Sequence, residues 1–182
     1  MEISTNKQTE TVAVTQEKLS LKEKVSYGFG DFGNGFMFDL GQLYLLKFFT
    51  DVAGIPAAAA GGIFLVSKLF AAFVDPIVGT SIDYRKNIGP KGKFRPYLLY
   101  GSFVLAILTI LTFISPNLSP TGKLIYAYAS YMLWGLGYSF VNIPYGSLGA
   151  AMTQNSVERT SLASFRQAGS LGALFVTSIV VI

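Results

Sequence analysis

Apolar stretches of about 20 residues follow one another along most of the chain, and this repetition limits the folds open to it. An α-helix of about 20 apolar residues crosses a hydrocarbon core roughly 30 Å thick. Such stretches occur at about 31–50, 57–83, 97–115, 124–152 and 165–182, and the third contains no charged residue. The pattern predicts an all-α, polytopic membrane protein with about five transmembrane helices.

The composition of the 182-residue chain excludes several other classes of protein. Hydrophobic residues make up 51% of it and charged residues only 13%, which is too apolar for an ordinary soluble domain. Neither cysteine nor histidine occurs, so disulfides, thiolate metal sites and histidine-based catalysis are excluded. We therefore expect neither an enzyme nor a protein with a bound metal or cofactor.

The basic residues are distributed in a way that predicts membrane orientation. The net charge is +4, and the connection at 84–96 holds five basic residues, whereas the connections on the opposite side, near 51–56 and 116–122, hold only Lys123 at their border. Cytoplasmic loops are enriched in Lys and Arg, so this connection and the polar N-terminal tail, 1–26, are predicted to be cytoplasmic. The charge thus gives no reason to expect a nucleic acid as partner. The five residues are Arg85, Lys86, Lys91, Lys93 and Arg95.

Ionisable side chains within the apolar stretches are the main indication of function. A charged group at the bilayer centre costs at least about 2.5 kcal/mol, so it persists mainly where it faces a polar interior. Asp39 lies deep in the first stretch, and Lys68 and Asp75 lie two helical turns apart on one face of the second. Such residues form either a structural ion pair between helices or a path for a proton or another cation.

The remaining polar residues of the first stretch allow two interpretations. Asp31 and Lys47 lie near its ends, where an interfacial or snorkelling charge is as reasonable as a functional one. Asn34 and Gln42 lie between them.

Prolines follow acidic or amide residues in the second and fourth stretches. Asp75 directly precedes Pro76, and Asn142 lies two residues before Pro144. Proline removes a helical hydrogen-bond donor and frees a backbone carbonyl. We therefore expect two interrupted helices that face a common cavity.

The fourth stretch combines aromatic with hydrogen-bonding side chains. Trp134, Tyr138, Ser139 and Asn142 follow closely upon one another there. This combination can stack on a sugar ring and bind its hydroxyl groups. Packing or interfacial anchoring of the aromatic residues is the alternative, because both are common in membrane helices.

Several segments, in their order and spacing, resemble one family of transporters. They are SYGFGDFGNGF, LLKFFTDVAGIPAAAAGGIFLVSKLFAAFVDPIVG, GKFRPYLL, WGLGYSFVNIPYGSL and ERTSLASFR. Over residues 27–166 the chain is similar to the glycoside–pentoside–hexuronide:cation symporters, the branch of the major facilitator superfamily that includes melibiose permease. The resemblance implies that a sugar or glycoside is carried by alternating access, coupled to a proton or sodium ion, across the cytoplasmic membrane of a bacterium.

A twelve-helix transporter of this kind needs roughly 240 residues in its spans alone, at about 20 per helix. The resemblance therefore implies that the chain is the N-terminal half of a transporter, 27–182, truncated before helix six. Its expected partners are the missing C-terminal half, the lipid bilayer and the sugar.

The resemblance also implies roles in cation coupling. Asp75 corresponds to the family's principal cation-binding carboxylate, and Ser139 is expected to supply a further oxygen. A second carboxylate of the family falls on Ala71 here, which favours a proton, because a sodium ion prefers several oxygen ligands. Asp39 and Lys68 are the other ionisable candidates.

For the substrate, the resemblance and the polar pattern together indicate a set of six residues. Acidic positions of the melibiose permease site fall on Gly35 and Asn142 here, whereas an arginine of the site is retained. A site with fewer acids that keeps an arginine suits an anionic sugar such as a glucuronide, and a neutral glycoside is equally consistent. The six residues are Asp31, Asn34, Trp134, Tyr138, Asn142 and Arg166.

The superfamily's loop signature after the second helix is implied to act as a gate between inward-open and outward-open forms. Its members here are Gly79, Asp83, Arg85, Lys93 and Arg95. Two alternatives stay open from the sequence: a membrane fragment or scaffold that does not transport, and a lipid-like solute carrier of the same superfamily.

Overall fold

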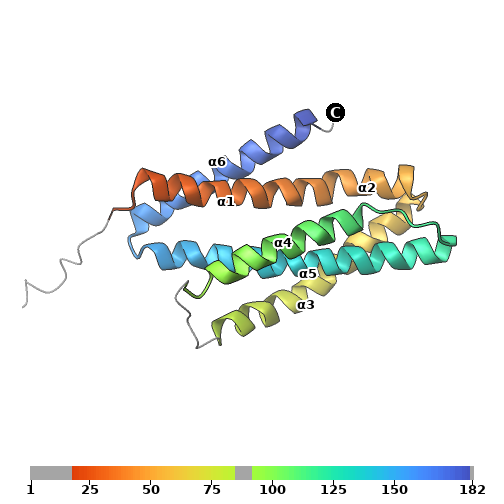
Figure 1. Cartoon of the computed structure of the whole chain (residues 1–182), viewed down its shortest axis with the longest axis horizontal. Helices are drawn as coiled ribbons and strands as arrows, with labels where there is room; N and C mark the ends of the chain where they lie inside the picture. The colour runs from red at the N-terminus through yellow and green to blue at the C-terminus, as the bar shows by residue number, and fades with distance from the viewer. Residues whose placement is uncertain (1–17, 85–91, 181–182) are drawn as a thin grey trace, which may run out of the picture.

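The computed structural model describes residues 18–84 and 92–180, and all regular structure within them is helical (Figure 1). No strand occurs in these residues, so the all-α prediction is confirmed. The long helices are α1 (Leu21–Asp39), α3 (Ala57–Asp83), α4 (Arg95–Thr112), α5 (Pro120–Met152) and α6 (Ser156–Val180). Because polar turns precede their apolar parts, α1, α5 and α6 each begin before the stretch that the sequence marks.

The first helix begins inside the segment 1–26, which the sequence suggests is a polar tail. Ser20 and Glu23 form a capping box: the Ser20 backbone N–H donates to Glu23 Oε2 over 2.8 Å, and the Glu23 N–H donates to Ser20 Oγ over 3.3 Å. These bonds satisfy donors that the first turn leaves free. The Ser-x-x-Glu pattern was the available sequence signal for this start. Residues 1–17 of the segment lie outside the described residues.

One helical run from Leu21 to Val52 changes its winding along its length. The helix α1 continues as the π-helix η1 (Leu40–Tyr44), the short α2 (Leu45–Lys47) and a second π-helix, η2 (Phe48–Val52). A Cβ atom at Gly41 would lie 2.7 Å from ring atoms of Trp134, so α5 approaches the run closely at η1. Wide turns of this type often mark functional positions in helices.

Neither internal proline interrupts its helix, so the prediction of two broken helices was wrong. α3 runs through Pro76, and α5 runs through Pro144. The fixed φ of proline is compatible with an α-helix, and the missing N–H costs one hydrogen bond of a long ladder. The departures from α-helical winding are the π-helices η1 and η2, in the run from Leu21 to Val52.

The helices are arranged around α5 and along α1. α1 packs along α6, while α5 packs against both α3 and α4 (Figure 1). The start of α1, the end of α3, the start of α4 and the connection from α5 to α6 lie at one end of the molecule (Figure 1). The main core is formed by the contacts of α2, η2, α3, α4 and α5, with Leu45, Phe49, Ile63, Leu105 and Trp134 among its buried members.

Small residues allow α1 and α6 to approach each other closely. A Cβ atom at Gly28 would lie 2.7 Å from the Phe165 carbonyl oxygen, and one at Gly169 would overlap the carbonyl oxygen of Gly28. Close backbone approach at glycines is typical of helix packing in membranes, where apolar burial contributes little to association.

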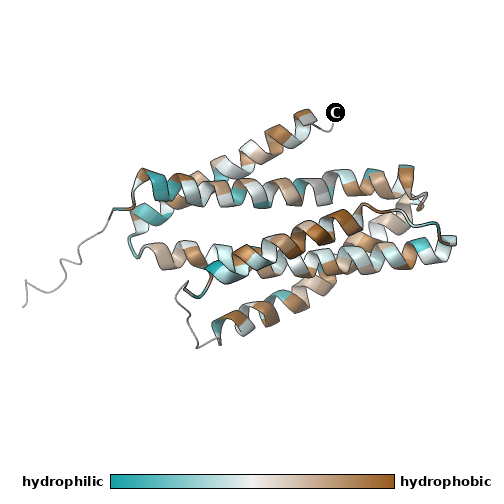
Figure 2. Ribbon diagram, in the orientation of Figure 1, coloured by the Kyte–Doolittle hydropathy of each residue, from teal (hydrophilic) through white to brown (hydrophobic). Residues whose placement is uncertain are grey.

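Large apolar side chains cover much of the outer surface. Phe73, Ile110 and Phe175 are 75%, 66% and 73% exposed, and Figure 2 shows hydrophobic residues along all of the long helices. Among the described residues, α3 and α4 are long and apolar enough to span a membrane by length and composition alone. Such an outer surface suits contact with lipid.

Candidate functional site

Asp75 and Ser139 meet between α3 and α5. Ser139 is 6% exposed, and its Oγ lies 2.5 Å from Asp75 Oδ1 and 3.1 Å from the Gly135 carbonyl oxygen. The shorter distance is that of a hydroxyl that donates to a carboxylate. The two residues expected at a cation site, 64 positions apart in the sequence, are therefore in direct contact.

This pair offers a carboxylate and a hydroxyl, both of which are oxygen groups. In the described residues no group of three or more Asp, Glu, His or Cys side chains is placed to hold a metal ion. A carboxylate with one hydroxyl partner can accept and release a proton without further ligands. A sodium ion would require additional oxygens.

A second polar contact joins α1 to α5. Asn34 is 9% exposed, and its Nδ2 donates to Asn142 Oδ1 over 2.9 Å. Asn34 Oδ1 is buried and has no hydrogen-bond partner among the described residues. Asn34 also lines a cavity of about 620 Å³ between α1, α4 and α5, together with Tyr145. Asn34 and Asn142, both expected at the substrate site, are thus in contact. Among the described residues Asn34 Oδ1 has no donor.

Arg166 of α6 reaches across to α1. Its NH2 atom lies 3.2 Å from Asp31 Oδ1, and the side chains of Arg166 and Asp31 are 33% and 15% exposed. The centre of the guanidinium group lies 4.9 Å from the Tyr145 ring centroid and 5.9 Å from that of Tyr27. A carboxylate and two aromatic faces therefore surround the arginine.

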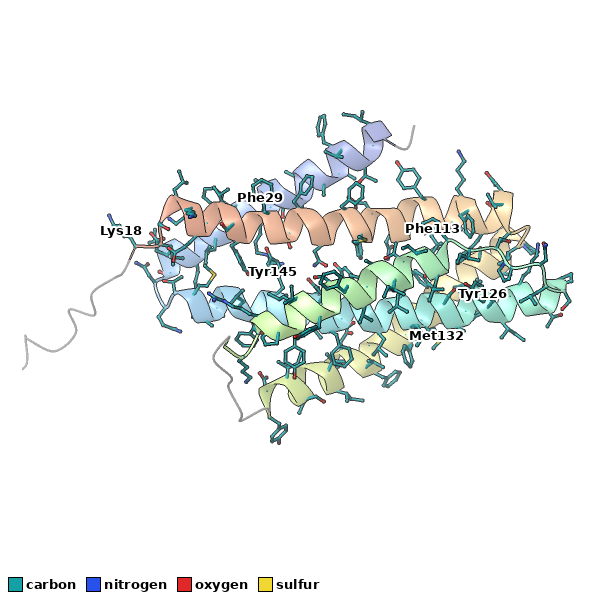
Figure 3. The ribbon with its side chains drawn as sticks, in the orientation of Figure 1. Lys18, Phe29, Phe113, Tyr126, Met132 and Tyr145 are labelled. Atoms are coloured by element: carbon teal, nitrogen blue, oxygen red, sulfur yellow. The ribbon has the colours of Figure 1, made fainter. Side chains whose placement is uncertain are left out.

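Tyr27 and Tyr145 form the base of this cluster. Their rings stack with centroids 4.8 Å apart. The Tyr27 hydroxyl donates to the Tyr145 carbonyl oxygen over 3.1 Å, and the Tyr145 hydroxyl donates to the Tyr27 carbonyl oxygen. Figure 3 shows the Tyr145 side chain in the space between α5 and α1.

Sequence reasoning did not identify this tyrosine pair. The available signal was spacing: Tyr27 precedes Asp31 by one helical turn, and Tyr145 follows Asn142 by about one turn. Each tyrosine therefore shares a helix face with a residue already expected at the substrate site.

Trp134 lies in the core rather than at an open surface. It is 4% exposed, its ring stacks on Tyr131 and Tyr138 at centroid distances of 5.5 and 5.6 Å, and its Nε1 donates to Thr109 Oγ1 over 3.0 Å. Within the described residues, Trp134 therefore packs against two tyrosine rings and donates its indole N–H to Thr109. Tyr138, which is only partly buried, ends the stack.

The other ionisable candidates lie near the same stack. The Phe38 ring lies 5.6 Å from that of Tyr138, and Lys68 Nζ lies 5.4 Å from the Phe38 ring centroid. Lys68 thus makes a cation–π contact with α1. Asp39, the next residue after Phe38, is partly buried.

The expected gating residues lie at the end of the molecule where α3 stops and α4 starts. Lys93 Nζ lies 3.1 Å from the Asp83 backbone oxygen and 3.7 Å from Asp83 Oδ1. Gly79 belongs to α3, and Arg95 is the first residue of α4. Arg85 lies outside the described residues.

Comparison with known proteins identifies close relatives. The profile of the family described as "MFS/sugar transport protein" matches residues 26–182. The "Uncharacterized symporter YjmB" of Bacillus subtilis (strain 168) is 81% identical over 167 residues, which are 92% of this chain and 36% of that protein.

Two further relatives come from Escherichia coli (strain K12). A protein whose name gives sulfoquinovose import as a proposed role is 46% identical over 162 residues, 89% of this chain and 35% of the relative. The "Glucuronide carrier protein homolog" is 45% identical over 152 residues, 82% of this chain and 33% of the relative.

The chain thus spans about a third of the length of the curated relatives that it matches. The family match covers nearly all of the helical part, and the relatives bear the names of symporters and solute carriers. The protein is therefore a membrane protein of a transporter family rather than of an enzyme family. The chain belongs to the MFS/sugar transport protein family, in the branch that comprises the glycoside–pentoside–hexuronide symporters.

Proposed function

We propose that the full-length protein containing this sequence is a symporter for an anionic sugar, driven by a proton gradient across the cell membrane. The observation that carries the proposal is Arg166, a partly buried arginine held among α1, α5 and α6. Arginine binds carboxylate, sulfonate and phosphate groups through parallel N–H donors.

The names of two relatives support an anionic substrate. Sulfoquinovose is a glucose derivative with a sulfonate at C6, and a glucuronide carries a carboxylate at the same carbon. One arginine can pair with either group. A hexose ring with an acidic group at C6 is therefore the substrate class that we propose for this chain.

The neighbouring polar groups suit the hydroxyls of such a ring. Asn34 Oδ1 is a buried acceptor without a partner among the described residues, and Asn142 bonds to the same side chain. Tyr138 adds a partly buried ring on the same helix as Asn142. Buried polar groups discriminate well among sugars, because a ligand that leaves them unpaired loses affinity.

For coupling, we propose that Asp75 carries the proton with Ser139 as its hydrogen-bond partner. Support comes from their 2.5 Å contact between α3 and α5. Protonation removes the charge of the carboxylate and so changes the cost of burying it, which links the proton to the conformation of the helices. Sodium is the alternative if oxygens from the rest of the transporter complete a site.

Alternating access needs a second half of the protein. We expect the remaining part of a transporter of the relatives' length to supply the facing wall of the cavity. In the proposed orientation, the N-terminal end of α1 and the connection between α3 and α4 face the cytoplasm. The contact of Lys93 with Asp83 at that end is then available to a gate.

The test uses membrane vesicles that contain the full-length transporter, with an imposed pH gradient or an imposed sodium gradient. Methyl glucuronide and methyl glucoside are the two solutes, because they differ only in the group at C6. Uptake of the glucuronide on the pH gradient is expected, with weaker uptake of the glucoside. Equal uptake of both would reject the anionic substrate, and uptake on the sodium gradient alone would reject the proton.

Three variants locate the site. Arg166→Gln should abolish the preference for the glucuronide, while Asn142→Ala and Tyr138→Ala should weaken binding of both sugars, because each removes a group from a desolvated site. Asn117→Ala, in an exposed connection, is the control. Unchanged affinity in all three variants would place the substrate elsewhere.

A further inference from the structure

Arg166 already forms an ion pair with Asp31. An anionic substrate that binds Arg166 must therefore compete with the Asp31 carboxylate. We propose that Asp31 is an exchangeable counter-ion, whose carboxylate leaves Arg166 when the acidic group of the substrate binds there. The inference rests on the proposed function, since it concerns how the same site accepts an anionic sugar.

The contact between the two side chains engages only part of the arginine. It joins Arg166 NH2 to Asp31 Oδ1 at 3.2 Å. A guanidinium group carries five N–H donors and can hold a carboxylate by two parallel bonds. An incoming carboxylate or sulfonate can therefore form the first bond to Arg166 before the bond to Asp31 is lost.

The arginine is also held independently of Asp31. Its guanidinium lies 4.9 Å from the Tyr145 ring centroid and 5.9 Å from that of Tyr27. The two rings are fixed by their own stack and by their two hydroxyl–carbonyl hydrogen bonds. When Asp31 leaves, these aromatic faces keep the guanidinium in place for the substrate.

Hydrogen-bonding groups for the rest of the sugar lie on the same helix faces. Asn34 follows Asp31 by about one turn of α1, and Asn142 precedes Tyr145 by about one turn of α5. Asn34 and Asn142 are bonded to each other, and Asn34 Oδ1 has no partner in the part of the chain that the structure describes. When the acidic group of the substrate binds Arg166, we therefore expect its sugar ring to lie beside the amides of Asn34 and Asn142.

Exchange of one acid for another gives the site its selectivity. A neutral sugar brings no charge to compensate Arg166, so breaking the pair with Asp31 would leave a partly buried guanidinium uncompensated. An acidic substrate replaces the lost charge. The Asp31 side chain is 15% exposed, so part of its surface stays open when the bond to Arg166 is lost.

The test compares Asp31→Asn and Asp31→Ala with the unmodified full-length transporter in detergent. Binding of methyl glucuronide and of methyl glucoside is measured by isothermal titration calorimetry. Removing the competing carboxylate should tighten binding of the glucuronide about tenfold, as expected for loss of a partly buried charge pair. Binding of the glucoside should stay unchanged in both variants. Asparagine keeps a hydrogen-bonding group and alanine does not, so agreement of the two assigns the effect to charge.

Glu158→Gln is the matched control. Glu158 pairs with Lys24 at 2.8 Å and also joins α6 to α1, so this variant breaks an ion pair between the same helices away from the cluster. Glu158→Gln should change neither the affinity for methyl glucuronide nor the affinity for methyl glucoside. Weaker or unchanged glucuronide binding in the Asp31 variants, or an equal shift for both sugars, would overturn the counter-ion role and make Asp31 a fixed positioning residue.

Failure of both Asp31 variants to fold would also overturn the inference, because a contact that the fold requires cannot be released at each binding event. The failure of the proposed function looks different. In that case the unmodified transporter itself shows no preference for methyl glucuronide over methyl glucoside.

Discussion

Tyr27 and Tyr145 each donate a phenolic hydrogen bond to the backbone carbonyl oxygen of the other, although 118 positions separate them in the sequence. They are 6% and 5% exposed. This reciprocal pair holds the start of α1 against the later part of α5 and forms the surface on which Arg166 rests. It therefore links the stability of the bundle to the geometry of the substrate site.

Replacement of either tyrosine by phenylalanine should destabilise the protein while the ring stack stays. Each change removes one buried hydrogen bond, which contributes about 1 kcal/mol to the free energy of unfolding. Chemical denaturation of the full-length protein in detergent measures the loss. Tyr126→Phe removes an exposed bond to the Leu111 carbonyl oxygen and should cost less. Equal losses at all three positions would show that burial of the tyrosine pair does not increase the contribution of its hydrogen bonds to the free energy of unfolding.

Asp75→Asn should abolish uphill accumulation of sugar and leave downhill exchange intact, because only the linkage to the ion is removed. Ser139→Ala should lower accumulation without abolishing it, since the carboxylate remains. Accumulation on a pH gradient and exchange without one are measured in the same vesicles. Asp51→Asn, at an exposed position of η2, is the control. If Asp75→Asn still concentrates sugar, Asp75 is structural and Asp39 becomes the next candidate.

Gly169→Ala should destabilise the packing of α1 on α6. The added Cβ would overlap the Gly28 carbonyl oxygen, and overpacking of this kind typically costs about 1–3 kcal/mol. Gly33→Ala, on the partner helix α1, is the comparison, since nothing lies within 4 Å of the Cβ added there. There the change should be neutral or slightly stabilising, because alanine favours a helix. Thermal unfolding of the two variants in detergent gives the comparison.

The ion pair between Lys24 and Glu158 should make stability depend on pH at the polar end of α1 and α6. The hydrogen bond from Lys24 holds the pKa of Glu158 below its ordinary value of 4.5, and Glu158 also accepts a bond from the Leu19 N–H. With a lowered pKa in the folded state, the unfolded chain binds the proton first as the pH falls. The contribution is therefore complete above the ordinary pKa and is lost as the pH drops through the folded-state pKa.

Glu158→Gln should remove this part of the pH dependence. Unfolding midpoints measured from pH 7 down to about pH 3 are expected to fall less steeply for the variant than for the unmodified protein. Parallel curves for the two proteins would show that the pair contributes no pH dependence.

The proposed orientation can be tested by labelling, because the chain has no cysteine. Tyr84 is 77% exposed at the end of α3, and Asn117 is exposed in the connection between α4 and α5. A cysteine at position 117 should react with a membrane-impermeant maleimide in intact cells, and one at position 84 only after the cells are opened. The reverse pattern would invert the topology.

The sequence by itself was sufficient for the class of protein and for much of the helical pattern. Apolar stretches of about 20 residues are long enough to cross a membrane as helices, and a helix pairs its backbone N–H and C=O groups within its own segment. Helical period also places Lys68 and Asp75, or Asp31 and Asn34, on one face. The resemblance to a transporter family added the expectation that Asp75 and Ser139 belong to one site.

The tertiary structure decided which faces meet. The contacts of Asp75 with Ser139, of Asn34 with Asn142 and of Asp31 with Arg166 join residues 64, 108 and 135 positions apart. Helical period fixes the direction of a side chain around its own axis, but the neighbour across a helix interface depends on close approach at residues such as Gly28 and Gly169. For the same reason, three features could be read only from the packed structure. They are the burial of Trp134 in the core, the hydrogen-bonded pair of Tyr27 and Tyr145, and the ion pair of Arg166 with Asp31.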